Sequence, residues 1–331
     1  MKKYDVCLVG ATGLVGSTFL KVLEECDFPI NRLKLLASKR SAGKKLTYKG
    51  ECLIVEELTE NSFDGHDLAF FSAGGTISKT YAPIAVERGL TVIDNSSAWR
   101  EDSEIGLVVP EVNFDDVKLN KLIANPNCST IQSVIPLAAL SKHFTLGSIS
   151  YTTYQAVSGS GASGVVDLAC TLKGDAPQFY PHNISKTCIP EIDIFTDNGY
   201  TKEEMKMIKE TKKILHKPNL PVSATCVRVP VENGHAVSIR VDIEEAFSTE
   251  SVLNAFRNHD GIVVLDEGEN HIYPTSVVAN DTDSVYVGRI RRDLSTKNGL
   301  LFYCVADNIR KGAASNAVQI AMKMAEENLI T

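Results

Sequence analysis

One of the eight cysteines in this 331-residue chain lies where a helix is expected to begin. Apolar residues run up to Ala124, the turn-forming segment NPN (125–127) follows, and apolar residues then recur with the helical period from Ile131. This pattern places Cys128 at or just before the first helical turn. Unpaired backbone N–H groups and the positive end of the helix dipole favour a thiolate there. The pattern indicates a reactive nucleophile, with a merely packed cysteine as the alternative.

Two more residues with useful chemistry lie in the stretch 224–243, which predicts two strands joined by a short turn at 232–234. Arg228 alternates with apolar neighbours on the first strand, and an inward-pointing guanidinium needs an anion, best a carboxylate bound through two nitrogens. His235 follows the turn and can act as acid or base near neutral pH. Each could instead be structural, because a histidine is commonly a satisfied core residue.

The elements that would position these residues begin with a nucleotide-binding pattern. An apolar run leads into glycines 10, 13 and 16 and then into a helical pattern, the context of a dinucleotide fingerprint with G-x-x-G-x-x-G spacing. Helical segments such as 78–88 separate further strand-like runs, and Gly74 and Gly75 close one of them. These runs are 33–38, 67–75, 90–97 and 121–125. The alternation predicts parallel βαβ units, with ligands at the carboxyl edge of the sheet.

The end of the second predicted strand indicates which dinucleotide would bind. NAD-binding domains usually place a carboxylate there for the ribose 2′-hydroxyl. This chain has Ser38-Lys39-Arg40-Ser41, without an acidic residue. Hydroxyls and cations suit a 2′-phosphate, so NADP is favoured over NAD. The alternative is an exposed basic loop with no ligand.

The second half of the chain has a different pattern. The segment 148–164 predicts a strand that runs into a Gly/Ser loop, 203–215 predicts a charged helix, and 284–293 and 299–308 predict further strands of a mainly antiparallel sheet. The alanine-rich segment 312–329 is expected to pack back on the first domain. We therefore predict an α/β protein with two domains. They are a Rossmann-type parallel-sheet domain that binds NADP, 1–127 plus 312–331, and an α+β catalytic and dimerisation domain, 128–311.

Composition narrows the class of partner. The chain has 34 Lys and Arg against 41 Asp and Glu, so its net charge of −7 gives no basic field for nucleic acid. No apolar run approaches the roughly 18 residues of a membrane span. The cysteines are scattered without a C-x-x-C pair, which argues against structural zinc and for a reducing cytoplasm. We expect a small-molecule substrate, no metal, no nucleic acid and no membrane.

The chain resembles the aspartate-β-semialdehyde dehydrogenase family over essentially its whole length. The motifs that carry the resemblance are VGATGLVG (9–16), SAGGTIS (72–78), NSSAWR (95–100), PEVN (110–113), NPNCST (125–130), QAVSGSGASG (155–164), EEMK (203–206), VRVPVENGH (227–235) and DNIRKGAASNAVQIA (307–321). The resemblance implies a fold similar to glyceraldehyde-3-phosphate dehydrogenase and a homodimer formed mainly through the second domain. It also implies NADP-dependent reductive dephosphorylation of L-aspartyl-4-phosphate to L-aspartate-4-semialdehyde through a cysteine thioester. That reaction belongs to the biosynthesis of lysine, threonine, methionine and diaminopimelate.

The resemblance also implies roles for residues of this sequence. Cys128 matches the nucleophile, His235 the general acid/base, and Gln155 the residue that orients the acyl-enzyme. The substrate-binding matches are Arg228 for the α-carboxylate, Glu203 near the ammonium group, Arg100 and Lys206 for the phosphate, and Asn127. The cofactor-binding matches are Gly10, Thr12, Gly13, Leu14, Val15, Ser38, Arg40, Ser41, Ala73, Gly74, Ser158, Gly159 and Asn308. Lys39 stands where relatives commonly have a small residue, which leaves the contacts to the 2′-phosphate open.

Two rival functions remain. The related reductase of N-acetylglutamyl phosphate performs the same chemistry on another acid, and the motifs NPNCST and EEMK speak against it. A catalytically inactive NADP-binding sensor is the other, and the intact set of Cys128, Gln155, Arg228 and His235 speaks against that.

Overall fold

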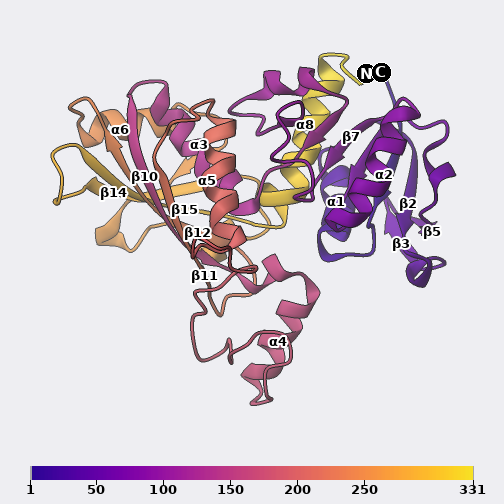
Figure 1. Ribbon diagram of the computed structural model, residues 1–331, viewed down its shortest axis with the longest axis horizontal. Coiled ribbons are helices and arrows are strands. Elements are labelled where there is room, and N and C mark those ends of the chain that lie inside the picture. Colours follow the sequence, from indigo (N-terminus) through magenta and orange to yellow (C-terminus); the bar gives the residue numbers. More distant parts are fainter. Residues whose placement is uncertain (1, 331) are drawn as a thin grey trace. The chain divides into compact units, whose positions relative to one another are not determined.

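The computed structural model describes residues 2–330, which form two compact units (Figure 1). The first unit runs to Pro126 and resumes at Ala313, and the second unit is Asn127–Gly312. Within the described residues, no helix is both long and apolar enough to cross a membrane.

The first unit is built on a seven-stranded sheet with the strand order β5-β2-β1-β6-β7-β9-β8 and parallel pairing throughout. Its strands are β1 (Tyr4–Val9), β2 (Ile30–Ala37), β5 (Glu56–Glu57), β6 (Leu68–Phe71), β7 (Thr91–Asp94), β8 (Gly106–Leu107) and β9 (Leu122–Ala124). The strands β3 (Lys45–Tyr48) and β4 (Glu51–Ile54) form a separate two-stranded antiparallel hairpin. Every residue of β6 and of β7 is buried, as expected for parallel strands covered on both faces. The predicted Rossmann-type sheet is confirmed.

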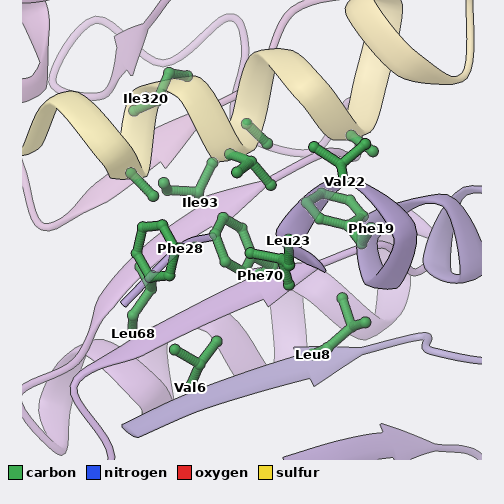
Figure 2. Packing of buried hydrophobic residues seen from close by; sticks show 14 of the residues in the cluster. Val6, Leu8, Phe19, Val22, Leu23, Phe28, Leu68, Phe70, Ile93 and Ile320 are labelled. Atoms are coloured by element: carbon green, nitrogen blue, oxygen red, sulfur yellow. The ribbon is translucent and has the colours of Figure 1, made fainter. Parts of the chain in front are cut away.

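The helices of this unit are α1 (Leu14–Glu25), α2 (Gly75–Glu87) and α8 (Ser315–Glu326). Figure 2 shows Phe19 on α1 and Ile320 on α8 beside Phe70 and Ile93 on the sheet, all within one buried cluster. The rings of Phe19 and Phe70 lie 5.2 Å apart between centroids. The buried face of α8 includes the small residues Ala317, Ala321 and Ala325, which let the helix approach the sheet closely.

The second unit contains a six-stranded mixed sheet in the order β11-β10-β12-β15-β14-β13. Its strands are β10 (Leu146–Gln155), β11 (Val222–Arg228), β12 (His235–Ile243), β13 (Ile262–Val264), β14 (Val285–Arg292) and β15 (Gly299–Ala306). The inner pairs are antiparallel, whereas β11 and β13 join the two edges in parallel. The predicted mainly antiparallel sheet is therefore confirmed for its centre.

The helices of the second unit are α3 (Cys128–Ser141), α4 (Ala162–Leu172), α5 (Lys202–Ile214), α6 (Thr249–Arg257) and α7 (Ser276–Ala279). Helix α3 packs on the middle of the sheet and also contacts α5 and α6, so these three form one layer. Residues 173–201 between α4 and α5 contain neither a helix nor a regular strand. The buried Asp167 carboxylate holds the start of this segment by accepting from the backbone N–H groups of residues 178–180.

The strands predicted in 224–243 are present as β11 and β12, but they are not neighbours, because β10 lies between them. The connection 229–234 crosses the end of β10, where Val157 and Ser158 donate backbone hydrogen bonds to it. Two strand spacings amount to about 9.5 Å, which six residues span easily. The crossing places Arg228 and His235 on opposite flanks of β10.

Candidate active site

A cluster of polar side chains lies at the carboxyl end of β10. Gln155 is opposite Arg228 of β11 in register, and His235 begins β12 on the other flank. Arg228 donates from Nη1 to the carbonyl oxygen of Ala156 at 2.6 Å, and the N–H of Ala156 donates to Nδ1 of His235 at 3.0 Å. One peptide residue is thus held by both side chains, which fixes the arginine and the histidine relative to each other.

The hydrogen bond at Nδ1 determines the tautomer of His235. A backbone N–H can only donate, so Nδ1 accepts and the neutral ring carries its proton on Nε2. Nε2 is buried and has no hydrogen-bond partner within residues 2–330. Burial, assisted by the Arg228 charge, lowers the pKa of His235 to about 3. His235 is therefore a neutral hydrogen-bond donor at neutral pH.

Arg228 is a buried cation, 4% exposed, whose guanidinium donates to a neutral carbonyl group. No carboxylate pairs with it within residues 2–330, and its Nε atom has no partner there. Arg240 and Arg310 of the same unit, by contrast, each pair with aspartate. Because a buried charge is costly without a partner, Arg228 favours an anionic ligand.

Gly159 closes the space beside these two side chains. A Cβ atom there would lie 2.8 Å from Nη1 of Arg228 and 3.0 Å from Nε2 of His235. The short 3-10 helix Val157–Ser160 can approach only because this residue has no side chain. Gly159, which the resemblance assigns to the cofactor, therefore also packs closely against His235 and Arg228.

Helix α5 adds charges to the cluster. The buried Glu203 carboxylate accepts from Asn127 Nδ2 at 2.8 Å, from Gln155 Nε2 at 3.1 Å and from Lys206 Nζ at 3.0 Å. Burial acts to raise the pKa of Glu203, but the Lys206 charge and the two amide hydrogen bonds outweigh it and hold the pKa at about 2. Glu203 is ionised throughout the physiological range.

Lys206 has two carboxylate partners, Glu203 and Asp193, the latter at 2.9 Å. Burial acts to lower the pKa of Lys206, but the two carboxylates outweigh it and leave the pKa raised. The ammonium group has three N–H donors, so one remains for a further ligand. Asp193 was not predicted, because it lies in the irregular segment 173–201, where no periodic pattern marks a partner.

Cys128 is the first residue of α3 and is half-buried, as the sequence predicted for a helix start. Asn127 caps the helix, since its Oδ1 atom accepts from the backbone N–H groups of Ser129 and Thr130. Gln132, one turn further along, donates from Nε2 to the carbonyl oxygen of His235 at 3.1 Å. The helix that carries the thiol is thus tied to the strand that carries the histidine.

The other predicted cofactor residues of the second unit lie next to this cluster. Asn308 accepts from the backbone N–H of Gly234 at 2.8 Å and donates to Ser158 Oγ at 2.9 Å. Together with Gly159, they belong to the surroundings of His235. Within residues 2–330, no group of three His, Cys, Asp or Glu side chains is placed to hold a metal ion.

The remaining predicted cofactor residues lie at the carboxyl edge of the parallel sheet in the first unit. They occupy the turn after β1 and the start of α1 (Gly10, Thr12, Gly13, Leu14 and Val15), the segment after β2 (Ser38, Arg40 and Ser41) and the loop after β6 (Ala73 and Gly74). Gly10 has φ +82°, and a Cβ atom there would lie 2.2 Å from the Ser72 carbonyl oxygen. A Cβ atom at Gly16 would meet the Gly10 carbonyl oxygen at 2.2 Å. This tight turn fits a dinucleotide pyrophosphate.

Two further features of that edge carry positive charge. Lys39 and Arg40 are exposed on a 3-10 turn after β2, whereas Ser41 is buried. Arg100 is buried and donates from Nη2 to the Asn95 carbonyl oxygen at 3.0 Å.

A cavity of about 520 Å³ opens beside the start of α2, lined by Gly75, Thr76, Lys79, Thr80, Ser97 and Ala98.

Sequence comparisons connect both units with one group of enzymes. The family described as "Semialdehyde dehydrogenase, NAD binding domain" matches residues 5–120, and "Semialdehyde dehydrogenase, dimerisation domain" matches residues 137–311. The aspartate-semialdehyde dehydrogenase of Aquifex aeolicus is 51% identical, over 99% of each chain. The first unit is thus a nucleotide-binding domain of the NAD(P) type.

Solved structures that are similar to this chain belong to the same group of enzymes. Aspartate semialdehyde dehydrogenase II of Vibrio cholerae, complexed with ASA, has a TM-score of 0.93 and 43% identity, and the match covers 99% of both chains. The aspartate semialdehyde dehydrogenase of Candida albicans, solved with NADP, has a TM-score of 0.81 and 26% identity, covering 99% of this chain and all of that one.

Proposed function

This chain belongs to the aspartate-semialdehyde dehydrogenase family, and we propose that it interconverts L-aspartyl-4-phosphate and L-aspartate-4-semialdehyde with NADP through a thioester on Cys128. The observation that carries the proposal is the buried Arg228 without a counter-ion, beside the free Nε2–H of His235. Its guanidinium suits the α-carboxylate of the substrate. The ionised Glu203 suits the α-ammonium group, which is the second charge of an amino acid.

The same charges argue against the rival substrate. In N-acetylglutamyl phosphate the amine is acylated and neutral, so Glu203 would gain no cation from it. A site that offers the buried Arg228 cation and the buried Glu203 carboxylate, with Lys206 beside the latter, matches an α-amino acid better.

In the reductive direction, the Cys128 thiolate attacks the acyl phosphate carbon, the C–S bond forms, and phosphate leaves with the electron pair of the C–O bond. NADPH, when bound, supplies the hydride that reduces the thioester. The thiolate of Cys128 then leaves from the reduced carbon, which gives the aldehyde. Negative charge develops on the substrate oxygen at each stage, and Nε2–H of His235 is suited to donate to it.

This role refines the general acid/base function that the sequence suggested for His235. Protonation at Nδ1 would remove the hydrogen bond from Ala156, and the low pKa opposes it. We therefore favour a fixed hydrogen-bond donor at Nε2 over proton uptake by the ring. Gln155 would orient the acyl group, because its amide is anchored on Glu203.

The remaining features complete the proposal. The exposed Arg40, flanked by Ser38 and Ser41, supports NADP over NAD, as does the Candida albicans relative solved with NADP. Arg100 and Lys206 would bind phosphate.

We further propose a homodimer formed through the second unit, which matches the dimerisation-domain family, and a place in lysine, threonine, methionine and diaminopimelate biosynthesis. None of the eight cysteines of the chain forms a disulfide in the described residues, the state that a cytoplasmic location maintains.

A spectrophotometric assay of NADPH formation from L-aspartate-4-semialdehyde tests the proposal. We expect turnover that requires phosphate, with a much higher kcat/KM for NADP than for NAD. Turnover without phosphate would exclude acyl transfer to phosphate. Preference for N-acetylglutamate semialdehyde would establish the rival function.

A further inference from the structure

Each polar group of Asn127, the residue before Cys128, forms a hydrogen bond. The backbone N–H of Asn127 donates to Glu210 Oε2 at 2.7 Å, and its side-chain amide donates to Glu203. Its carbonyl oxygen accepts from the backbone N–H of Ile131, and Oδ1 accepts the two capping bonds of α3. The peptide that leads into Cys128 therefore has a fixed orientation.

Glu210 is the part of this arrangement that the proposed chemistry does not use. It is 2% exposed and lies two helical turns after Glu203 on the buried face of α5. A carboxylate that accepts from a backbone N–H forms a strong, charge-assisted bond. Glu210 thereby ties the start of α3 to α5, one residue before the thiol.

A second element meets Cys128 directly. Residues Arg310–Ala314 form a π-helical turn in which the Gly312 N–H donates to the Asp307 carbonyl oxygen. A Cβ atom at Gly312 would lie 2.8 Å from Cβ of Cys128 and 3.3 Å from its Cα. These neighbouring atoms belong to the backbone and the first side-chain carbon, so they cannot rotate away. The glycine is required by space, and π-turns of this kind are frequent at functional sites.

The same segment also contacts the residue before His235. Asn308, four residues before Gly312, accepts from the backbone N–H of Gly234. One short stretch of chain therefore contacts both Cys128 and the turn that ends at His235.

We propose that Glu210 and Gly312 are positioning residues for the Cys128 thiol: Glu210 holds the preceding peptide, and Gly312 sets how closely the π-turn packs on the cysteine. The inference rests on the proposed role of Cys128 as nucleophile. Neither residue touches the reacting atoms in this scheme, and both act through Cys128.

Glu210→Ala tests the first half, with Glu204→Ala as a matched control. Glu204 is buried on the same helix and also accepts backbone N–H bonds, but from Thr201 and Cys226. The measurement is the rate of Cys128 alkylation by iodoacetamide against pH, together with kcat and thermal unfolding. We expect alkylation and kcat to fall about 10- to 100-fold for Glu210→Ala. Glu204→Ala should lower the unfolding temperature and leave alkylation within about twofold.

The direction of the change separates positioning from charge. Removal of a nearby negative charge would favour the thiolate and so raise the alkylation rate below the thiol pKa. A rise for Glu210→Ala would therefore overturn the proposal, as would equal losses of alkylation in Glu210→Ala and Glu204→Ala. Glu210→Gln keeps an acceptor oxygen, so it should stay within about threefold of wild type, and a clear rise would again mean a charge effect.

Gly312→Ala tests the second half, with Gly268→Ala as the control for the substitution itself. The nearest atom to a Cβ at Gly268 would be 4.0 Å away, on the Arg289 side chain. We expect kcat and alkylation to fall on the order of 10²-fold in Gly312→Ala only. Unchanged alkylation and kcat would overturn this half, and so would failure of Gly312→Ala to fold, because a role confined to positioning Cys128 predicts a folded variant. Absence of any fast-alkylating thiol in wild type, judged against Cys128→Ser, would count against the proposed function instead.

Discussion

Arg40 in the first unit and Arg228 in the second are both proposed to bind an anion, but their surroundings differ. Arg40 is exposed in the middle of the 3-10 turn Lys39–Ser41, where its side chain can take many rotamers. Arg228 is buried, and its guanidinium is fixed on the Ala156 carbonyl group next to His235. An exposed charge contributes affinity that salt weakens, whereas a buried and oriented charge also sets geometry.

The same difference extends to the rest of each unit. At the edge of the parallel sheet, the dinucleotide turn is shaped by backbone, with Gly10 and Gly16 where a Cβ atom would collide with a carbonyl oxygen. The cluster around β10 uses buried side chains that hold one another through hydrogen bonds. We therefore expect substitutions in the second unit to affect catalysis steeply and those in the basic loop to affect cofactor affinity gradually.

Cys128→Ser should show the largest effect and the sharpest separation of the two units. A serine hydroxyl stays protonated at any pH that the helix start could reach, so turnover should fall on the order of 10⁶-fold. NADP binding, measured by calorimetry, should be unchanged. Retention of more than a small fraction of the wild-type rate would remove Cys128 from the mechanism.

His235→Ala should lower kcat by about 10²–10³-fold, because it removes a donor to the developing oxyanion. His235→Gln can still present an N–H and should recover part of this loss. Equal rates for the two variants would instead favour proton transfer by the imidazole, which an amide cannot perform.

The burial of His235 also predicts a pH effect on stability. Its folded pKa of about 3 lies below the ordinary value of 6.5, so below pH 6.5 the unfolded state takes up a proton that the folded state does not. Stability from this group is full above pH 6.5 and falls by about 1.4 kcal/mol per pH unit as the pH drops towards 3. Hydrogen exchange of β10 and β12 between pH 5 and 6.5, where Glu203 stays ionised, should show this slope in wild type and a flatter one in His235→Gln.

Arg228→Lys keeps the buried charge but loses the two-pronged geometry. We expect kcat/KM for aspartate semialdehyde to fall about 10²-fold, with KM for phosphate nearly unchanged. Steady-state kinetics with each substrate varied in turn measure this. Lys206→Ala is a poorer probe of the phosphate site, because it also removes a partner of Glu203, so Arg100→Ala is the better contrast.

The sequence predicted the periodic parts of this molecule and missed the long-range ones. Alternating apolar strands and helices indicated the parallel sheet, and the helix start at Cys128 followed from the turn residues before it. The crossing of 229–234 over β10 was missed, because a short connection between two strands suggests neighbours and no local pattern shows a third strand between them. Glu210 and Asp193 were missed for a related reason, since the partner of Glu210 lies 83 residues away and Asp193 itself lies in an irregular segment. The seven-residue spacing of Glu203 and Glu210 was the one available signal.

Arg40→Ala should have the smallest effect and the clearest dependence on salt. A charge-assisted contact to the 2′-phosphate contributes about 1.5–3 kcal/mol, so NADP should bind roughly 10- to 150-fold more weakly while NAD binding barely changes. Lys45→Ala removes an exposed charge from the same unit and serves as the control. Because Arg40 is exposed, the loss should shrink as salt rises, whereas the effect of Arg228→Lys should not. If NADP and NAD lose affinity equally, the basic loop is only solvated surface. If salt leaves the loss unchanged, Arg40 is as enclosed as Arg228 in the bound state, and the contrast between the two arginines fails.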